Sequence, residues 1–394
     1  MKIKELAEKY NDYIIEQRRF FHQYPELSLQ EVETTKTIAS ELEKMGIEVS
    51  FFDGITGCVG LLKGAKPGPT VLLRADIDGL TVHEQTGLPF QSKCDGKMHA
   101  CGHDCHISMQ LGAAKILSEL RDELCGNVKF FFQPAEELAV GAKICIEKGV
   151  LDDVSACYGM HIWGQVDCPK INIASGERMA SCDTFKLKIK GTSAHGSAPH
   201  LGKDAILAAS AIIMNLQSIA SRTNDPLNAL VITIGTFNGG QRFNIIADSV
   251  ELEGAARTFS KKFRMEIEEI IRNIAKSTAK AYGCTAELSY QYLAASVINE
   301  DENLVKIAQN AAVSLYGEDA LVDFEKLTGS EDFSELMEKV PSVYAFLGAR
   351  SEKTEGSGYS NHHEKFTPDE DALHHGAAIA AQFAYDYLKS ESEK

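Results

Sequence analysis

The chain has 394 residues, of which 44% are hydrophobic and 24% charged, the composition of an ordinary globular protein. At roughly 150 residues per domain, this length predicts two to three domains. A net charge of −16 repels phosphate backbones and anionic lipids, so we expect neither a nucleic-acid partner nor a membrane partner. No apolar run reaches the ~18 residues of a spanning helix, and the N-terminal segment lacks the apolar stretch of a signal peptide. Ten irregularly spaced cysteines then indicate reduced thiols and a cytoplasmic protein.

The first part of the chain alternates helical and strand patterns. We expect a helix over residues 2–24, a second over 30–45 that ends at Gly46, and a strand that ends at Leu62. Short apolar runs of the kind buried in parallel sheets follow, at residues 70–75, 127–132, 155–160 and 342–347. This alternation predicts an α/β fold with a mostly parallel central sheet and helices on both faces.

Residues 183–293 follow a different pattern. The first strand there alternates Phe185, Leu187 and Ile189 with lysines, as a strand with one wet face does. The expected elements continue as a helix over 204–221, strands over 228–237 and 249–258, a helix over 261–282 and a strand over 285–293. The order βαββαβ is the split unit of ferredoxin-like folds. We therefore expect a main domain in two parts, 1–182 and 296–394, and an inserted domain over 183–295.

Each of the four buried runs leads into side chains that bind metals or protons: Asp76 and Asp78, Glu136 and Glu137, His161, and Asn361-His362-His363. Ligands of open α/β sheets bind beyond the carboxyl ends of the strands, so we expect these side chains to converge. The densest cluster, MHACGHDCH at residues 98–106, opens a predicted helix, where a thiol loses its proton more easily. A thiolate together with imidazoles and carboxylates suits zinc, or manganese where oxygen ligands dominate.

The adjacent pair Glu136-Glu137 follows a buried run and Pro134, which ends the strand. Neighbouring side chains on an irregular loop point in different directions. One carboxylate can therefore bind a metal while the other takes a proton from a water that attacks a carbonyl. The chain carries no HExxH, GxSxG, Walker A or GxGxxG segment, and its C-x-H-x-C spacing is not that of a zinc finger.

Several segments occur in order along the chain: RADIDGL, MHACGHDCH, FQPAEE, MHIW, GTSAHGSAPH, residues 244–257 and GSEDFS. Together they resemble the M20 metallopeptidase family, closest to its amidohydrolases of N-acyl-amino acids, which include hippurate hydrolases and auxin-conjugate hydrolases. The resemblance spans residues 22–373. It implies metal-dependent hydrolysis of the amide bond of N-acyl-L-amino acids by two divalent metal ions per subunit, zinc or manganese first and cobalt or nickel as alternatives. The implied metal ligands are Cys101, His103, Glu137, His161 and His362.

The resemblance also implies the remaining roles. Glu136 falls where the family has its general base, and Asp78 where it has a carboxylate that orients the site. In the inserted domain, His195 matches the histidine that stabilises the tetrahedral oxyanion, often across a dimer. Asn244 and Arg257 match positions that hold the substrate, and a guanidinium suits a substrate carboxylate because it donates two parallel hydrogen bonds. We therefore expect a homodimer formed through an inserted lid and dimerisation domain.

This chain departs from the family pattern near the site. Leu138-Ala139-Val140 stands where a glycine-rich run usually follows the Glu pair, and Thr81 replaces a frequent proline. His363 follows His362 directly and is an alternative to it as the last ligand.

Two rival interpretations stay open from the sequence. A cysteine-nucleophile amidase would use Cys101 to attack and His103 as its base. A metal-containing binding protein would keep the same fold without turnover. The other histidines of interest, His99, His106, His374 and His375, receive no role, the last two being expected on a helix surface. Small core side chains are expected at Cys58, Cys125, Cys145, Cys157 and Cys284.

Overall fold

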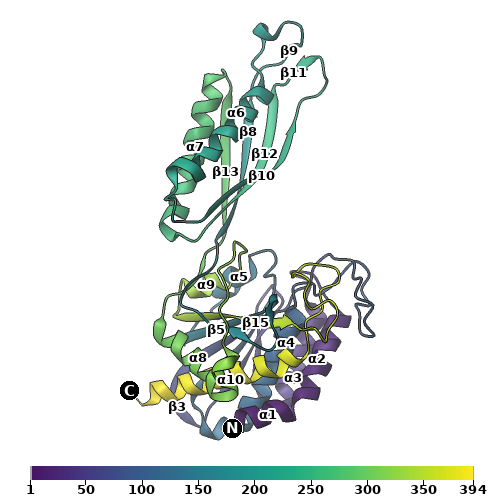
Figure 1. The fold of residues 1–394 in the computed structure, drawn as a ribbon, viewed down its shortest axis with the longest axis vertical. Coiled ribbons are helices and arrows are strands. Elements are labelled where there is room, and N and C mark those ends of the chain that lie inside the picture. The colour runs from purple at the N-terminus through teal and green to yellow at the C-terminus, as the bar shows by residue number, and fades with distance from the viewer. Residues whose placement is uncertain (1, 394) are drawn as a thin grey trace. The chain divides into compact units, whose positions relative to one another are not determined.

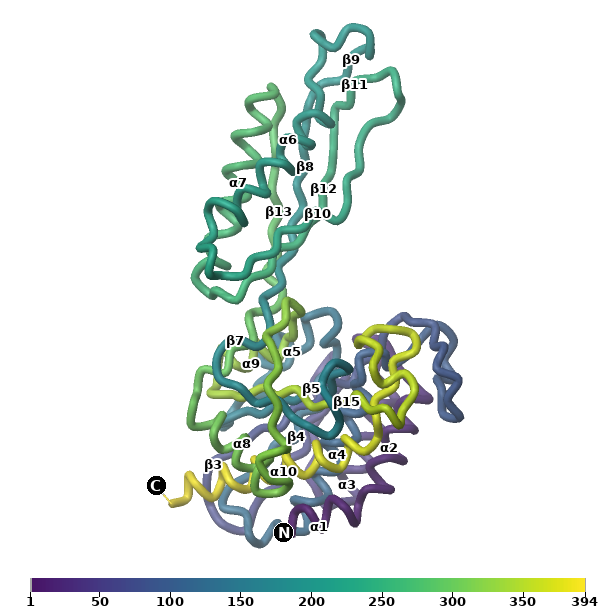
Figure 2. Tube along the Cα trace, viewed as in Figure 1, coloured from purple at the N-terminus to yellow at the C-terminus, as the bar shows by residue number. Residues whose placement is uncertain are grey.

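The computed structural model describes residues 2–393, which divide into two compact units. Unit 2 comprises Glu177–Val297 and Lys326–Glu331, and unit 1 comprises the rest of the described chain. The colours of Figure 2 trace this division, because unit 2 is drawn from the middle of the chain and unit 1 from its two ends. Strands β7 (Gly176–Met179) and β14 (Val297–Asn299) lie where the chain passes between the units.

Unit 1 is built on a seven-stranded sheet with the order β1-β2-β4-β3-β5-β15-β6. Figure 1 labels β3, β5 and β15 of this sheet. The strands are β1 (Glu48–Phe51), β2 (Cys58–Lys63), β3 (Lys66–Asp76), β4 (Cys125–Gln133), β5 (Val154–Asp167), β6 (Ile171–Asn172) and β15 (Ser342–Arg350). The four central strands, β4, β3, β5 and β15, run parallel, and antiparallel strands flank them at both edges. Each predicted apolar run lies in one of these central strands, where most of its side chains are buried. The α/β prediction is confirmed.

Helices cover both faces of this sheet, as consecutive residues of β5 demonstrate. The Tyr158 ring packs on Phe383 of the C-terminal helix, with ring centroids 4.9 Å apart. A Cβ at the next residue, Gly159, would lie 3.0 Å from Phe333, just before α9, on the opposite face. The helices of unit 1 are α1 (Lys2–Lys9), α2 (Asn11–Gln23), α3 (Val32–Lys44), α4 (His103–Glu119), α5 (Gly141–Glu147), α8 (Glu302–Tyr316), α9 (Ser334–Met337) and α10 (Asp371–Ser392), with short 3-10 turns at Arg121–Glu123 and Glu318–Ala320.

The expectation of one continuous helix over residues 2–24 is wrong at one point. The helix ends at Lys9 and a new one begins at Asn11, because Tyr10 has a ψ of 8°. The Tyr10 hydroxyl bonds Glu119 at the end of α4, a tertiary contact that no local pattern announces.

Two smaller expectations also fail. His374 and His375 are half-buried on α10 rather than exposed, and Cys125, at the start of β4, is partly exposed rather than in the core.

Unit 2 has the expected βαββαβ order. Its antiparallel sheet has the order β10-β12-β8-β13, and its two long helices are α6 (Ala205–Ser218) and α7 (Lys261–Ala281). The strands are β8 (Cys182–Lys190), β10 (Leu230–Gly239), β12 (Ser249–Thr258) and β13 (Thr285–Ala294), and a separate small ribbon pairs β9 (Ala194–His195) with β11 (Ile245–Ile246). The Asp204 carboxylate caps α6 by accepting from the N–H groups of Ile206 and Leu207, as an N-cap residue should.

One helical stretch in the described chain, Ala205–Thr223, is long and apolar enough to cross a membrane by length and composition alone. This corrects the expectation that no such run exists. The stretch combines α6 with the π-turn Ile219–Thr223, and it presents two different faces. Its buried face packs into the core of unit 2, whereas Leu207 and Met214 on the other face are 53% and 72% exposed.

A buried ion pair at the start of β8 generates a stability prediction. Asp183 is 1% exposed and accepts three hydrogen bonds from the Arg264 guanidinium, of 2.7, 3.0 and 3.2 Å, one from the Tyr290 hydroxyl and one from the Leu293 N–H. Asp183→Ala removes a buried ion pair and its hydrogen bonds, so we expect the free energy of unfolding of unit 2 to fall by about 3 kcal/mol.

Denaturant unfolding followed by circular dichroism measures this change. Tryptophan fluorescence does not suit unit 2, because the single tryptophan, Trp163, lies in unit 1. Lys186→Ala on the same strand is the control, because its ion pair with Glu253 is solvent-exposed and contributes less than about 1 kcal/mol. Equal destabilisation by the two variants would contradict the prediction.

Candidate active site

The carboxyl ends of the parallel strands of unit 1 bring the predicted side chains together. Asp76 ends β3 and Asp78 follows it, while Glu136 and Glu137 lie on the loop after β4. His161 lies within β5, which continues past it to Asp167 instead of ending before it. The remaining residues come from loops, Cys101 from the turn before α4 and His362 from the segment between β15 and α10.

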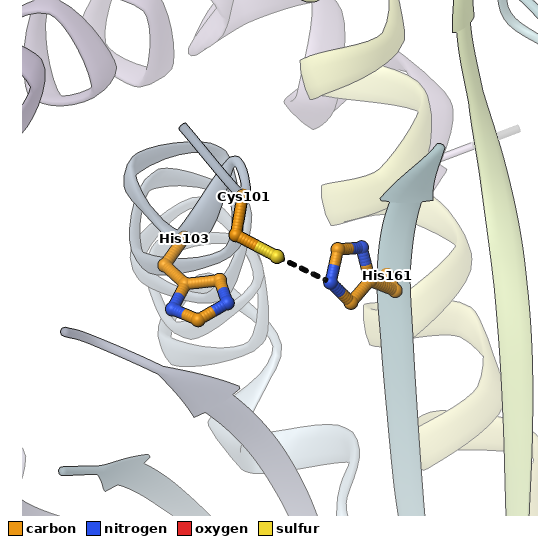
Figure 3. A group of neighbouring side chains, drawn as sticks. All are labelled: Cys101, His103 and His161. Atoms are coloured by element: carbon orange, nitrogen blue, oxygen red, sulfur yellow. Dashed lines mark hydrogen bonds between the residues drawn. The ribbon is translucent and has the colours of Figure 1, made fainter. Parts of the chain in front are cut away.

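Cys101, His103 and His161 form one group of possible metal donors, whose ligand atoms all lie within 4.8 Å of one another (Figure 3). The Cys101 Sγ is 3.3 Å from the His161 Nε2. Gly102 makes this approach possible, because its φ is +96° and a Cβ there would lie 2.4 Å from the Ile162 side chain. A glycine between the thiol and His103 is therefore a steric requirement of the site.

Two further groups share donors with the first. Cys101 also gathers with Glu137 and His362, and His103 gathers with Glu136 and Glu137. The His362 Nε2 lies 3.2 Å from the Cys101 Sγ and 3.4 Å from a Glu137 oxygen. All five predicted ligands thus converge on one place, and Glu136 lies beside them.

His103 and His161 each form a hydrogen bond to a backbone carbonyl through Nδ1, which leaves the lone pair of Nε2 available to a metal ion. The His103 Nδ1–H donates to the Asp78 carbonyl at 2.8 Å, and the His161 Nδ1–H donates to the Ile162 carbonyl at 2.7 Å. Both rings then direct Nε2 towards the other donors, the arrangement usual for metal-binding histidines. The His103 Nε2 and a Glu137 oxygen are buried, and neither has a hydrogen-bond partner among the described residues. Buried polar atoms normally have partners, so these donors fit a bound cation.

Electrostatics support the same fit. Burial alone would lower the pKa of His103, but Asp76, Asp78 and Glu137 raise it to about 10. Burial raises the pKa of the Cys101 thiol well above its usual value, and Glu137 and Glu136 raise it further. The expected acidic thiol at a helix N-terminus is therefore wrong for the chain by itself, since burial and carboxylates outweigh the helix. The site combines negatively charged carboxylates with one sulfur donor and several nitrogen donors. Divalent cations bind such donors and neutralise the negative charge.

Two buried carboxylates hold the loop that carries the Glu pair. Asp78 accepts the backbone N–H groups of Glu136 and Glu137 at 3.2 and 3.1 Å. Glu31 is fully buried and accepts the Ala135 N–H at 2.9 Å and the Thr56 hydroxyl at 2.5 Å. Ala135 has a φ of +53°, unusual for a residue with a side chain, so the carboxylate of Glu31 stabilises a strained backbone next to Glu136.

Sequence analysis missed two residues that support the site, His106 and Glu31, and it gave Asp76 no role of its own. Asp76 accepts a hydrogen bond from the His106 Nδ1–H, and the His106 Nε2 accepts the Ile162 N–H at 2.9 Å, beside His161. His106 was assigned no role, although its spacing of three residues from His103 places both on one helix face. Glu31 resembled an ordinary acidic residue before a helix. Nothing in its local sequence indicates that it is buried.

The two histidines at the end of the motif have different surroundings. The His363 ring stacks on Tyr359 with centroids 4.1 Å apart, and its Nδ1 accepts the Lys365 N–H. His362, with a φ of +73°, is the one that joins the donor group. The geometry therefore favours His362 over His363 as a ligand.

Of the three residues of unit 2 expected to act on the substrate, two lie together and the third lies apart. His195 on β9 pairs with Ile245 on β11, and the Gly196 N–H donates to the Asn244 carbonyl at 2.8 Å, so His195 and Asn244 are neighbours. Arg257 lies near the other end of β12 and donates to the Thr328 carbonyl at 3.0 Å. Eight residues of extended strand separate Arg257 from Ser249, about 25 Å. Within one chain, His195 and Arg257 are therefore too far apart to contact the same small molecule.

The contacts of Glu31 generate a prediction about this loop. Glu31→Ala leaves the buried Ala135 N–H and the partly buried Thr56 hydroxyl without this acceptor. We expect the free energy of unfolding to fall by about 2 kcal/mol and metal affinity to weaken about tenfold as the Glu pair shifts. Chemical unfolding and competition against a chromogenic chelator measure the two effects.

Glu31→Gln keeps an acceptor, so it should lose less stability and less metal affinity than Glu31→Ala. Glu33→Ala is the matched control on the neighbouring helix, because the Glu33 side chain is 73% exposed and forms a surface ion pair with Lys36. Unchanged metal affinity in Glu31→Ala would show that the loop holds its position without this carboxylate.

Comparisons with known proteins agree with this geometry. The model of peptidase family M20/M25/M40 matches residues 72–386. N-acetylcysteine deacetylase of Bacillus subtilis (strain 168) is 40% identical over 98% of this chain and 100% of its own length. IAA-amino acid hydrolase ILR1-like 4 of Arabidopsis thaliana is 39% identical over 96% of this chain and 86% of its own. The crystal structure of the Bacillus subtilis YXEP protein, described as a dinuclear metal binding peptidase from the M20 family, superposes with a TM-score of 0.85 at 39% identity, covering 97% of this chain and 99% of that one. The chain therefore belongs to peptidase family M20/M25/M40, and within it the chain is an amide-bond hydrolase.

Proposed function

We propose that this chain hydrolyses the amide bond of N-acyl-L-amino acids and releases a carboxylic acid and a free amino acid. The observation that carries the proposal is the convergence of three donor groups that share Cys101, His103 and Glu137 beside the carboxylate of Glu136. The names of two relatives, a deacetylase of N-acetylcysteine and a hydrolase of IAA-amino acids, support the same substrate class.

Two divalent cations fit the donor set. Cys101, His103 and His161 would hold one side of the centre, and Glu137 and His362 the other. Such cations polarise a carbonyl and make a water molecule acidic enough to lose a proton near neutral pH. The mixture of nitrogen, oxygen and sulfur donors accepts zinc or manganese first, and cobalt or nickel as alternatives.

Each of the remaining site residues has its own role in the proposed reaction. Glu136 takes the proton of the attacking water and passes it to the amine nitrogen that leaves. Asp78 holds Glu136 and Glu137 through their backbone N–H groups and orients His103 through its own carbonyl. His195 donates a hydrogen bond to the oxygen on which negative charge develops. Arg257 binds the carboxylate of the amino acid, and Asn244 assists in holding the substrate.

Metal removal separates this proposal from its rivals. Dialysis against EDTA should lower the hydrolysis of N-acetyl amino acids to roughly 1% or less, and reloading with Zn²⁺ or Mn²⁺ alone should restore it. EDTA saturated with Ca²⁺ is the control for effects of the chelator itself. A cysteine-nucleophile amidase would keep its rate in EDTA and lose it to iodoacetamide. A binding protein would hydrolyse none of these substrates under any of these conditions.

We further propose a homodimer formed through unit 2. Strand β10 is an edge strand of its sheet, and an edge left unpaired tends to recruit another strand. Exposed apolar side chains accompany it, Phe237 on the strand and Leu207 and Met214 on α6, at 40%, 53% and 72% exposure. A second copy of the chain would cover this surface. A cytoplasmic location is also proposed, on the cysteine pattern of the sequence alone.

The separation of His195 from Arg257 gives the dimer a function. Both are proposed to contact one substrate, but about 25 Å of extended strand lies between Arg257 and the Ser249 end of β12, near which His195 lies. We therefore infer that the two side chains come from different copies. The substrate carboxylate is then bound by Arg257 of one chain, and the oxyanion by His195 of the partner subunit.

Complementation tests this arrangement. Glu136→Gln and His195→Ala should each lower kcat by about a hundredfold or more as homodimers. Mixed dimers of the two variants, co-expressed with different affinity tags and purified on both, contain one site with an intact Glu136 and an intact His195 from the other chain. We expect about half the wild-type activity per dimer. Mixed dimers no more active than either homodimer would place His195 in its own chain's site and contradict the proposal.

A further inference from the structure

Asp332 lies in the GSEDFS segment, residues 329–334, which contributes to the family resemblance but has no role in the site described above. It precedes α9 and is 1% exposed. A buried carboxylate is costly unless hydrogen-bond donors surround it, so the partners of Asp332 indicate what it does. The partners described below all lie with Asp332 in unit 1.

Two of these partners flank the loop that carries Glu136 and Glu137. The side-chain amide of Gln133, the last residue of β4, donates to the Asp332 Oδ1 at 2.6 Å. The N–H of Ala142, in the first turn of α5, donates to the Asp332 Oδ2 at 3.0 Å. One carboxylate therefore joins the strand before the loop to the helix after it, with one oxygen for each end.

The loop is closed tightly between these two ends. A Cβ at Gly141 would lie 1.6 Å from the Pro134 carbonyl oxygen, so only glycine fits where the chain returns. The Gly141 N–H donates to the Ala135 carbonyl at 3.2 Å. A shift of either end is therefore transmitted to Glu136 between them, and a carboxylate oxygen of Glu136 lies within 4.8 Å of one of Asp332.

Arg74 on β3 supplies the positive charge of this arrangement. Its side chain is 1% exposed, and it donates to the Asp332 Oδ1 at 3.1 Å and to the Gln133 side-chain oxygen at 2.9 Å. It also donates to the Asp76 Oδ2 at 2.6 Å, and Asp76 is the register partner of Gln133 across β3 and β4. Paired and hydrogen-bonded charges of this kind are the ones that a protein interior tolerates.

We propose that Asp332 is a positioning residue, which holds both ends of the loop and thereby sets the place from which Glu136 takes the proton of the attacking water. The inference rests on the proposed function, in which Glu136 is the general base. Glu31 and Asp78 hold the middle of the same loop through backbone N–H groups, so Asp332 adds the constraint on its ends. A displacement of about 1 Å at a reacting group can cost up to a hundredfold in rate.

Asp332→Asn tests the proposal, because it keeps the size of the side chain but leaves one acceptor oxygen where Asp332 has two. The new NH2 group must face either the Ala142 N–H or the donors of Gln133 and Arg74, and it can accept from none of them. We expect kcat for N-acetyl-methionine to fall roughly thirtyfold while KM stays within about threefold of wild type. The metal content should remain that of wild type.

Hydrogen exchange over residues 135–142 is a readout that does not depend on activity. Followed by mass spectrometry, the amide protons of this segment should exchange roughly tenfold faster in Asp332→Asn than in wild type. Asp301→Ala is the matched control. Asp301 accepts two N–H groups at the start of α8 and lies beside Ser155 and Pro341, at the amino ends of β5 and β15. Its loss should leave kcat and the exchange of residues 135–142 unchanged.

Gln133→Met is a second variant with a milder change. It removes the hydrogen bond between Gln133 and Asp332 but leaves the contacts of Asp332 with Arg74 and Ala142. We expect part of the loss of kcat, and a double variant with Asp332→Asn that is no slower than Asp332→Asn alone, because both changes release the same end of the loop.

Wild-type kcat in Asp332→Asn, or the same loss of kcat in Asp301→Ala, would overturn the proposal. Loss of metal from Asp332→Asn would overturn it as well, since Asp332 would then support metal binding instead of the place of Glu136. Should Asp332→Asn not fold, wild-type kcat and exchange in Gln133→Met would decide against the proposal. If wild type does not hydrolyse N-acetyl-methionine, the proposed function has failed, and unchanged exchange in Asp332→Asn would show separately that Asp332 does not hold the loop.

Discussion

The carboxylate of Asp78, buried at the end of β3, connects parts of the site that come from distant segments. It accepts the backbone N–H groups of Glu136 and Glu137 and the Ser28 hydroxyl, and the Asp78 carbonyl accepts the Nδ1–H of His103. Burial by itself would raise the pKa of Asp78, but His103 and Ser28 lower it below its usual value, so the carboxyl remains an anion. A buried anion is costly unless donors surround it. The loop after β4 and the start of α4 are therefore stable in these positions only together, and this coupling places the Glu pair beside His103.

Most of the fold follows from patterns that extend over several residues. The buried runs in the central strands and the βαββαβ order of unit 2 were predictable. In a helix, apolar residues recur at every turn, and in a half-buried strand at every second residue, so several residues carry the same pattern. Single-residue departures were not predictable. Tyr10 interrupts a helix through a contact with α4, and Ala135 and His362 have positive φ values although neither is glycine. Such conformations are imposed by tertiary contacts, which leave no mark on the local sequence.

The same distinction explains which site residues sequence analysis found. Cys101, Glu137 and His362 follow turns or strand ends and belong to dense clusters of metal-binding residue types. Glu31 and His106 act through other residues, one on the backbone of Ala135 and one on the backbone of Ile162. An acid or a histidine on a helix is common, and only its burial and its partner separate a positioning residue from a surface one. Recognising either from sequence would require knowledge of which strands lie beside which helices.

The insertion of unit 2 has a consequence for how such a site can be regulated and specialised. Unit 1 contains every proposed metal ligand and the proposed base, so its geometry is constrained by the cations. Unit 2 carries the proposed contacts to the rest of the substrate on two separate sheets. Arg257 lies on β12 of the four-stranded sheet, near the start of β8, and His195 lies on the β9–β11 ribbon. Changes in the loop before Asn244 do not disturb the sheet that positions Arg257, because the two are separated by the length of β12. Under the proposed arrangement, that loop can therefore vary while recognition of the amino-acid carboxylate and the metal chemistry stay as they are.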